Sequence, residues 1–336
     1  MERKQNLTID DIARDLGVSK TTVSRAISGK GRISAATRER VQAYIQKMNY
    51  RPSAAAKGLA ESKTYNLALV LPKSLFKLDI PFIRKSMSAI CEEAFLQDYN
   101  ILLCLSTDDN PASLLRTLDN RKVDGVILSR TVENDMLVDI LVQRGIPFST
   151  MGSLPAQSRG SATVEADHDQ VGGCRAFTTA FLGRNAEKVA LFGNDMNYIV
   201  NQSRLAGFRQ GVEALGLSEA QISLNFGMDS AAVCAEAVDR ALAQNIRRFL
   251  AMDEEVCINM LMRLRELGLQ IPRDVQVGSL YDSDQLACHC PGISALNFDA
   301  AALGRAACRE LLRYLRKEEY DPRPTLGYRI LMRESS

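Results

Sequence analysis

Residues 8–28 read TIDDIARDLGVSKTTVSRAIS, a stretch with two apolar patterns of helical spacing on either side of a glycine. The first pattern predicts a helix whose N-cap is Thr8, because apolar residues recur there at i, i+3, i+4 and i+7. The members of this stripe are Ile9, Ile12, Ala13 and Leu16. We expect Gly17 to end the helix and Ser19 to cap the next one.

The second predicted helix has two chemically distinct faces. Its inward residues are Val23, Ala26 and Ile27, whereas its opposite face carries only basic and hydroxylated side chains, namely Lys20, Thr21, Ser24, Arg25 and Ser28. Two short helices joined by a tight turn, the second with a polar outer face, form a helix-turn-helix, which fits the major groove of DNA. A helical hairpin with a merely solvated face is the alternative interpretation.

The residues that follow favour the DNA-binding interpretation. Ser34 is expected to cap a third helix, which the segment 49–52 then breaks, so three short helices make a headpiece of about fifty residues. Residues 1–63 contain 13 Lys and Arg against 6 Asp and Glu, a net charge of +7, whereas the remainder of the chain carries −5. A concentration of positive charge in residues 1–63 is expected if this segment binds the phosphates of DNA.

Four motifs in fixed order resemble the LacI/GalR family, the lactose-repressor and galactose-repressor transcription regulators. They read LTIDDIA at 7–13, GVSKTTVSR at 17–25, ISAATRERV at 33–41 and NYRPSAAAKGL at 49–59. The resemblance implies a regulator that binds operator DNA as a homodimer and binds a small effector between two core subdomains.

Within the headpiece, we predict that Lys20, Thr21 and Arg25 contact base edges. We predict phosphate contacts for Thr8, Ser19, Thr22, Ser24 and Arg32. Residues 53–63 form the linker, and the resemblance implies a hinge helix that forms on DNA, with Leu59 as a wedge in the minor groove and Lys57 as a further DNA contact.

From residue 64 onward, short apolar strands alternate with amphipathic helices, which predicts parallel sheets covered by helices on both faces. The fold class is therefore an N-terminal all-α helix-turn-helix headpiece with a hinge helix, followed by an α/β core of two doubly wound parallel-sheet subdomains, similar to periplasmic binding proteins. We expect strands at 66–72, 101–105, 126–129, 146–151, 189–193, 221–225, 248–252, 275–280 and 325–332. We expect helices at 82–97, 112–121, 134–144, 168–182, 202–215, 230–244, 254–267 and 299–317.

The expected domains are the headpiece at 1–52, the hinge at 53–63 and the core at 64–336. The resemblance implies that the backbone crosses three times between the core subdomains, here near 163, 295 and 325. The N-subdomain then comprises about 64–163 and 296–324, and the C-subdomain about 164–295 and 325–334.

Ligands of open α/β sheets bind beyond the carboxyl ends of the strands, where this sequence is rich in carboxylates and amides. Such groups, with aromatic rings, recognise hydroxylated ligands. The polar segments are 74–82, 106–109, Ser129 with Arg130, 194–204, Asp253 with Glu254, and 281–284.

The resemblance assigns several of these positions to the effector. Arg204 begins RLAGF, which matches an effector-binding motif, and Asp79 and Phe82 belong to the first pocket loop. Met252 and Asp253 stand where the family usually has Asn-Asp, and Tyr281 and Asp282 stand where it usually has Asp-Asp. Arg130 completes the predicted set. We expect Asp253 or Asp282 to pair with Arg204 when the cleft is empty.

The predicted effector is a sugar or a sugar derivative. A purine or nucleoside corepressor is the alternative, followed by an α/β solute-binding protein without a DNA role. Met252 and Tyr281 replace polar family residues, which favours an effector less hydroxylated than a free hexose or one bound in a different pose.

Other function classes are excluded by what the sequence lacks. It contains no membrane-spanning apolar run and no signal-peptide pattern, so we expect a cytoplasmic protein with free thiols. Cys288-His289-Cys290 has no second pair at zinc spacing, and we expect neither metal nor cofactor. There is no phosphate-loop motif, no nucleophile elbow and no HExxH motif, so we expect a protein that is not an enzyme.

Overall fold

The computed structural model describes residues 7–29, 31–48, 50, 58, 61–72, 81–106, 110–183 and 188–336. The chain divides into two compact units, Met1–Thr64 and Tyr65–Ser336, each of which is described by itself.

The first unit contains three helices, α1 (Ile9–Leu16), α2 (Lys20–Ser28) and α3 (Ala35–Lys47). The predicted caps are confirmed: the side chains of Thr8, Ser19 and Ser34 each accept a backbone N–H from the first turn of the following helix. Gly17 ends α1 with φ 64°, a left-handed conformation that glycine adopts without strain. The buried core of this unit consists of Ile12, Ala13, Val23, Ala26 and Val41.

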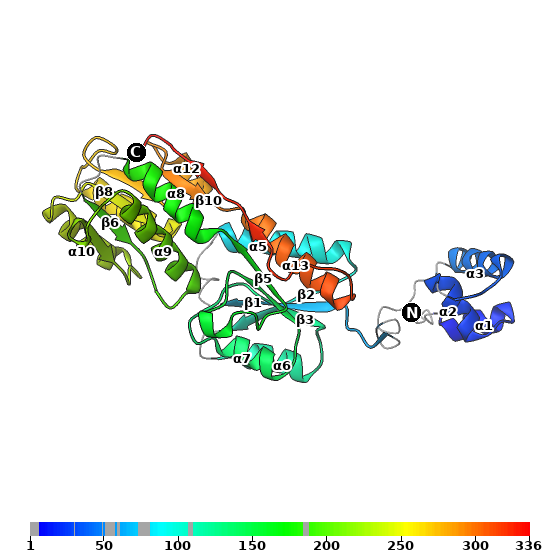
Figure 1. The fold of residues 1–336 in the computed structure, drawn as a ribbon. Helices are drawn as coiled ribbons and strands as arrows, with labels where there is room; N and C mark the ends of the chain where they lie inside the picture. The colour runs from blue at the N-terminus through cyan, green and yellow to red at the C-terminus, as the bar shows by residue number, and fades with distance from the viewer. Residues whose placement is uncertain are drawn as a thin grey trace. The chain divides into compact units, whose positions relative to one another are not determined.

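The first sheet of the second unit has the strand order β11-β5-β4-β3-β1-β2, and all its pairs are parallel. Its strands are β1 (Asn66–Pro72), β2 (Asn100–Ser106), β3 (Gly125–Leu128), β4 (Phe148–Met151), β5 (Val164–His168) and β11 (Thr325–Leu326). Alternate residues of β1 face opposite layers, because Leu67 and Leu69 pack on one side and Ala68 and Val70 on the other. The first side carries α5 (Pro81–Leu96) and α13 (Ala300–Leu315), and the second α6 (Ala112–Asp119) and α7 (Met136–Gln143) (Figure 1).

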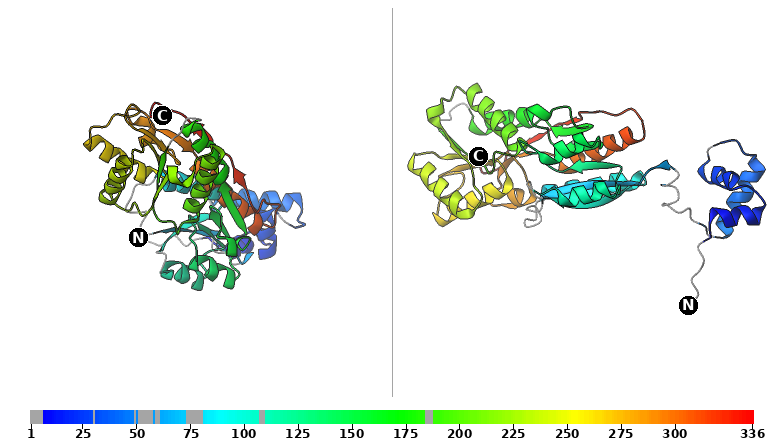
Figure 2. Two further views of the ribbon diagram at one scale, coloured as in Figure 1. Left: turned by 60° about the vertical axis from the view of Figure 1, so that its left-hand side comes forward. Right: turned by 90° about the horizontal axis from the view of Figure 1, so that it is seen from below.

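The second sheet has the order β12-β10-β9-β8-β6-β7, in which only β12 runs antiparallel to its neighbour. Its strands are β6 (Val189–Phe192), β7 (Ile222–Asn225), β8 (Arg248–Ala251), β9 (Gln276–Ser279), β10 (Ser294–Asn297) and β12 (Arg329–Leu331). One face packs on α8 (Gln170–Leu182) and α9 (Ile199–Ala214), and the other on α10 (Ala231–Ala243) and α11 (Glu254–Glu266). The short helix α12 spans Asp284–Cys288, and Figure 2 shows both sheets from two further directions.

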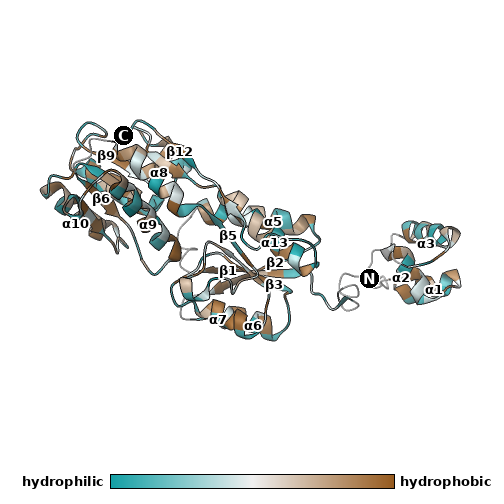
Figure 3. Ribbon diagram, viewed as in Figure 1, coloured by the Kyte–Doolittle hydropathy of each residue, from teal (hydrophilic) through white to brown (hydrophobic). Residues whose placement is uncertain are grey.

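The helices of both units carry apolar and polar residues along their length, as Figure 3 shows by the mixture of brown and teal on each. This pattern is expected for helices that bury one face against a sheet or a partner helix. Close helix packing is illustrated by Gly304 of α13, where an added Cβ would lie 2.5 Å from the backbone oxygen of Ser86 in α5. The backbones of α5 and α13 are therefore in direct contact at this point.

Three details of the predicted core are wrong. Strands β5 and β10 were not expected, yet Val164–His168 pairs with β4 in the first sheet and Ser294–Asn297 pairs with β9 in the second. The single strand expected at 325–332 is two strands, since β11 joins the first sheet and β12 the second. The three crossings follow His168, Asn297 and Leu326. The last two agree with the expected positions near 295 and 325, and the first lies later than the expected position near 163.

All eight cysteines are free, and five of them are buried. Within the described ranges, no group of three His, Cys, Asp or Glu side chains is arranged to hold a metal ion. The same part of the chain contains no helix with the length and apolar character needed to cross a bilayer.

Candidate effector cleft and DNA-binding helix

The outer face of α2 presents the side chains that were predicted to contact bases. Lys20, Thr21 and Arg25 are exposed, whereas Val23 and Ala26 on the opposite face are buried in the headpiece core. Lys20 forms an ion pair of 2.6 Å with Asp10 of α1, and both side chains are solvent-accessible, so a phosphate or base can replace Asp10 at little cost.

The predicted phosphate contacts are accessible as well, although two of them, Thr8 and Ser19, also cap helices. Thr8, Ser19, Ser24 and Arg32 are exposed and Thr22 is half-buried. The oxygens of Ser19 and Thr22 lie 2.8 Å apart, and Thr8 forms a capping box with Asp11. The hydroxyls of Thr8 and Ser19 therefore stabilise the first turns of α1 and α2. Lys57 and Leu59 lie outside the described residues, as does Asp79 of the first pocket loop.

The stem of Arg25 is held by the turn after α2. A Cβ added to Gly31 would lie 3.0 Å from Cδ of Arg25, so the absence of a side chain at Gly31 leaves room for this arginine. Gly31 also has φ 90°, a conformation that other residues rarely adopt. The turn thereby restricts where the Arg25 guanidinium can lie.

A cleft of about 630 Å³ opens between the two sheets of the core unit. Its wall is made largely of residues that follow the carboxyl ends of β3, β4, β5, β6, β8 and β9, as expected for an open α/β sheet. Of the residues predicted from the sequence, the wall includes Phe82, Arg130, Arg204, Asp253 and Tyr281.

One side of the cleft is bridged by backbone hydrogen bonds between the subdomains. Val132 and Tyr198 form an isolated antiparallel bridge, and the N–H of Glu133 donates to the carbonyl of Asn197 at 2.9 Å. The guanidinium carbon of Arg130 lies 4.1 Å from the centroid of the Tyr198 ring, a cation–π distance.

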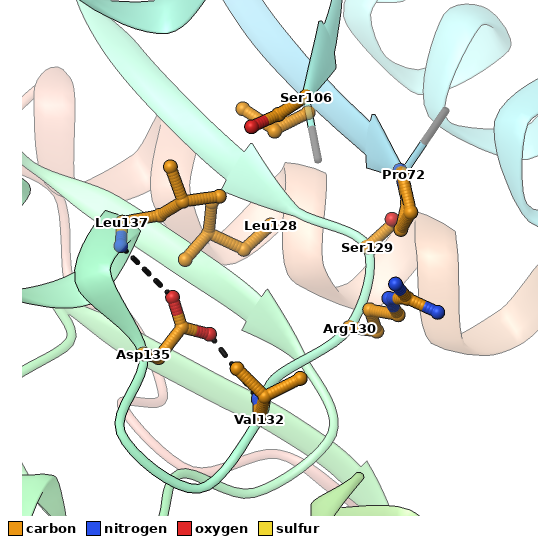
Figure 4. Close-up of a pocket in the computed structure, with 9 residues that line it drawn as sticks. Pro72, Ser106, Leu128, Ser129, Arg130, Val132, Asp135 and Leu137 are labelled. Carbon is orange, nitrogen blue, oxygen red and sulfur yellow. Dashed lines mark hydrogen bonds between the residues drawn. The ribbon is translucent and has the colours of Figure 1, made fainter. Parts of the chain in front are cut away.

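Asp135 fixes the loop that makes this bridge. Its carboxylate accepts the backbone N–H groups of Val132 at 3.2 Å and Leu137 at 3.0 Å, as Figure 4 shows. The loop encloses a small pocket of about 20 Å³ next to Ser106, with room for about one water molecule. This loop therefore supports the cleft wall at Arg130.

The other side of the cleft is bridged by side chains. The rings of Phe82 and Tyr281 meet edge to face with their centroids 5.9 Å apart, so the two subdomains contact each other through aromatic residues. Nearby, Nζ of Lys85 lies 3.1 Å from a carboxylate oxygen of Asp284. Both contacts join α5 to the segment after β9.

Arg204 lines the cleft from the second turn of α9, and only 8% of its surface is exposed. Its Nη1 donates a long hydrogen bond of 3.4 Å to Asn201, while its Nε is buried and has no hydrogen-bond partner among the described residues. The expected pairing with Asp253 or Asp282 is wrong, because Asp253 caps α11 through the N–H of Val256 and Asp282 pairs with Arg333 at 2.7 Å.

Two predicted effector residues lie elsewhere in the core unit. Met252 is fully buried in the apolar cluster of the second sheet and packs against Gly193, where an added Cβ would come within 2.4 Å of its sulfur. Asp282 also accepts a hydrogen bond from Asn297 and is absent from the cleft wall. Family position alone placed both residues in the site, and local packing removes them from it.

The sequence did not single out Asp167, Gln170 or Phe298, which also line the cleft. The first two lie at the end of β5 and the start of α8, and because β5 was not recognised, its carboxyl end was not examined. Asp167 accepts hydrogen bonds from both the N–H and the hydroxyl of Ser153, and burial raises the pKa of its carboxyl.

His168 joins two of the three crossings. Its ring lies 5.0 Å from that of Phe298, centroid to centroid, and within the described part of the chain both of its nitrogens are buried without a hydrogen-bond partner. Burial, with a smaller contribution from the charge of Arg204, lowers the pKa of His168 to about 4. The imidazole is therefore neutral at physiological pH.

A helix-turn-helix unit linked to an α/β core with a cleft between two sheets defines a ligand-responsive DNA-binding protein. Residues 8–53 match the family model of bacterial regulatory proteins of the lacI family, and residues 178–336 match that of the periplasmic binding protein-like domain. The chain belongs to the LacI family of transcriptional regulators, which are not enzymes.

Similar proteins cover nearly the full length of the chain. The regulator CelR of Thermobifida fusca is 28% identical over 100% of both chains, and the repressor PurR of Vibrio vulnificus is 26% identical over 94% of both. The structure of a CelR–cellobiose complex superposes with a TM-score of 0.71, at 26% identity over 98% of this chain and 100% of that one. The Lac repressor dimer bound to operator and an anti-inducer has the same fold, with a TM-score of 0.79 at 19% identity over 98% of this chain and 99% of that one.

Proposed function

We propose that this regulator binds operator DNA as a homodimer through α2 and that a sugar or sugar derivative in the cleft sets its DNA affinity. The observation that carries the effector assignment is Arg204, a guanidinium that is nine-tenths buried in the cleft and lacks a carboxylate partner among the described residues. A permanent charge in such a position is stabilised when a ligand oxygen accepts from it.

On the DNA side, Lys20, Thr21 and Arg25 read base edges, while Thr8, Ser19, Thr22, Ser24 and Arg32 hold phosphates. The exposure of these side chains on and beside α2 supports this division. Lys57 and Leu59 complete the interface from the hinge, where Leu59 opens a central base step of the operator. In this proposal 1–52 is the headpiece, 53–63 is the hinge, and 64–336 is the core.

The sugar assignment rests on the chemistry of the wall. Phe82, Tyr281 and Phe298 supply apolar ring surface, and amide and carboxylate groups alternate with them, which suits the faces and hydroxyls of a saccharide. The cellobiose complex of CelR supports the same class. A purine or nucleoside corepressor is the second candidate, supported by the similarity to PurR.

The partner in the homodimer is expected to cover an exposed apolar surface at the edge of the first sheet. Phe95 and Leu96 of α5 are 79% and 71% exposed, and Leu103 and Leu105 of the edge strand β2 are also exposed. An apolar patch beside an unpaired strand edge is unstable in water unless another chain covers it. Replacing Phe95 and Leu103 by Lys should convert the dimer to a monomer in sedimentation experiments, whereas Val142→Lys on α7 should not.

Because operator DNA lies in the bacterial cytoplasm, we place the protein there. The experiment that tests the whole proposal is selection of bound sequences from random duplex DNA, followed by gel shifts of the selected site at several salt concentrations with and without sugars. A palindromic site whose affinity falls with salt and changes with one sugar supports the proposal. No sequence preference would contradict the DNA role, and no response to any sugar would contradict the effector class.

A further inference from the structure

The cleft wall contains more hydrogen-bond acceptors and more negative charge than its two guanidinium groups balance. Among the described lining residues, the positive groups are Arg130 and Arg204, and the carboxylates are Asp167, Asp195, Asp253, Glu254 and Glu255. Arg130 is stacked on Tyr198, while Lys85 outside the wall is paired with Asp284. By formal charge, carboxylates therefore outnumber guanidinium groups in the cleft wall.

Several buried polar atoms of this wall, including those of Ser129 and Glu254, have no hydrogen-bond partner among the described residues, and two more bear directly on the ligand. One is Nε of Arg204, a donor, and the other is Oε1 of Gln170, an acceptor; each residue is only 8% exposed. The Gln170 side chain also hydrogen-bonds Asp167, which fixes the amide and leaves its oxygen as the free end. A buried acceptor and a buried donor in one cleft mark positions where a ligand must supply both a donor and an acceptor.

Only some ligand groups meet this requirement. Sugar hydroxyls can both donate to Gln170 and accept from Arg204, whereas a phosphate or carboxylate group can only accept. Because an anionic sugar keeps its other hydroxyls, it is the charge of the wall that discriminates against it. An anion would be repelled by the carboxylates of the wall. One of these, Oε1 of Glu254, is itself buried without a partner, and burial together with Asp253 and Asp284 raises the pKa of Glu254.

Resting on the proposed function, we propose that the effector is an uncharged saccharide with neither phosphate nor carboxylate, and that Gln170 selects it by accepting one of its hydroxyls. Gln170 is then a residue that determines specificity. The carboxylates at the start of α11, Glu254 and Glu255, exclude the phosphorylated and acidic forms of the same sugar.

The first test measures binding of matched compounds to the full-length protein by calorimetry. The probes are cellobiose, maltose and glucose as uncharged sugars, with glucose 6-phosphate, glucuronate and cellobionate as their anionic counterparts. We expect the uncharged member of a pair to bind about tenfold or more tightly than the anionic one. Replacing both Glu254 and Glu255 by Gln should narrow this ratio, whereas Glu236→Gln on the exposed surface of α10 should leave it unchanged.

The second test addresses Gln170 directly. Gln170→Met keeps the length of the side chain and removes the acceptor, so affinity for the uncharged sugar should fall about tenfold, because the ligand hydroxyl loses its partner. Gln210→Met is the matched control, since Gln210 lies on the exposed surface of α9 and does not line the cleft. Thermal unfolding of each variant verifies that it folds. The comparison of uncharged with anionic sugars uses the wild-type protein and does not depend on any variant.

The outcomes separate this inference from the proposed function. If an anionic sugar binds as tightly as its uncharged counterpart and Arg204→Ala abolishes that binding, the inference is wrong while the effector cleft stands. If Gln170→Met binds the uncharged sugar as tightly as wild type, the role of Gln170 is wrong. If the protein binds selected DNA but no sugar of either kind, the sugar effector is wrong, and the inference is wrong with it.

Discussion

The guanidinium carbon of Arg204 lies 5.8 Å from the centroid of the Tyr281 ring, and this ring in turn meets Phe82 across the cleft. The three side chains form a continuous contact from α9 to α5 through the segment after β9. A ligand that accepts from Arg204 must therefore lie against Tyr281, so binding at the cationic end also affects the contact between the subdomains. Any change in subdomain angle that follows must be coupled reciprocally to DNA affinity.

Arg204→Ala should abolish effector binding, with a loss of a hundredfold or more, while the protein without ligand keeps its operator affinity. The loss is large because a ligand oxygen would be left without its charged donor in a buried site. Calorimetry and gel shifts measure the two affinities. Arg209→Ala, on an exposed part of the same helix, is the control. Effector binding by Arg204→Ala within about threefold of wild type would show that the ligand is held elsewhere.

Arg25→Ala should relax sequence preference at one base pair of each half-site. A bidentate pair of arginine with guanine contributes about 1 to 3 kcal/mol of discrimination. Competition gel shifts with single-base operator variants measure this effect. Arg14→Ala, on the exposed surface of α1, should leave the preference unchanged. An equal loss of affinity for all sequences would make Arg25 a phosphate contact only.

Asp282→Asn should destabilise the core without reducing effector affinity. The Asp282–Arg333 pair is largely buried, and removal of one charge from such a pair costs about 3 to 5 kcal/mol when the other is left without a partner. Thermal unfolding and calorimetry measure stability and binding separately. Asp284→Asn breaks an exposed pair and should change stability little. A selective loss of effector binding by Asp282→Asn would restore the original assignment of Asp282 to the site.

His168 should make stability depend on pH between about 6.5 and about 4. The histidine of the unfolded chain has an ordinary pKa of about 6.5, whereas burial, with a smaller contribution from Arg204, lowers the pKa of His168 in the folded chain to about 4, and Asp299 opposes this shift. The unfolded state therefore binds more protons in this window, and stability falls by up to about 3 kcal/mol as the pH decreases through it. Below about pH 4 both states are protonated and this contribution changes no further.

Denaturant titrations of His168→Phe across the same pH range test this dependence. The substitution keeps a ring against Phe298 and removes two nitrogens that have no partners, so the slope should flatten while stability at pH 7 is retained. His289→Asn changes the other histidine of the chain and should leave the slope intact. The same slope in wild type and His168→Phe would assign the pH dependence to other groups.

Gly304→Ala should destabilise the core by about 1 to 3 kcal/mol. Alanine has the higher helix propensity, but its Cβ would lie 2.5 Å from a backbone oxygen of α5, which can move only with its helix. Chemical denaturation measures the loss. Gly327→Ala is a suitable control, because nothing lies within 4 Å of the added atom there. An unchanged midpoint for Gly304→Ala would mean that α5 and α13 separate at little cost.

Local signals predicted most of the fold. Apolar spacing and caps located α1 and α2, and apolar runs located β1 to β4 and β6 to β9, because each of these features depends on neighbours in sequence. Strand β5 was missed because VEADH combines two acidic residues and a histidine with a short apolar pattern, and its strand character depends on pairing with β4. Missing this strand also meant missing two cleft residues, because Asp167 lies at the end of β5 and Gln170 begins the helix that follows it.

Side-chain direction was the part that sequence could not supply. Met252 and Asp253 are adjacent, yet one packs inward on Gly193 and the other reaches the cleft wall and caps α11. Asp282 could pair with either of two arginines, and the choice of Arg333 depends on β12, a strand that joins the second sheet from the far end of the chain. Such choices are decided by contacts between distant segments.

The stacking of His168 on Phe298 joins the ends of β5 and β10, and the next residue of each crossing, Asp169 or Asp299, caps the helix that follows. Two of the three crossings between the subdomains therefore cannot twist independently, because a change of backbone torsion in one displaces the ring that packs on the other. The subdomains are therefore joined by a hinge in which two of the three crossings move together. A ligand that tilts one sheet must turn both of these crossings together.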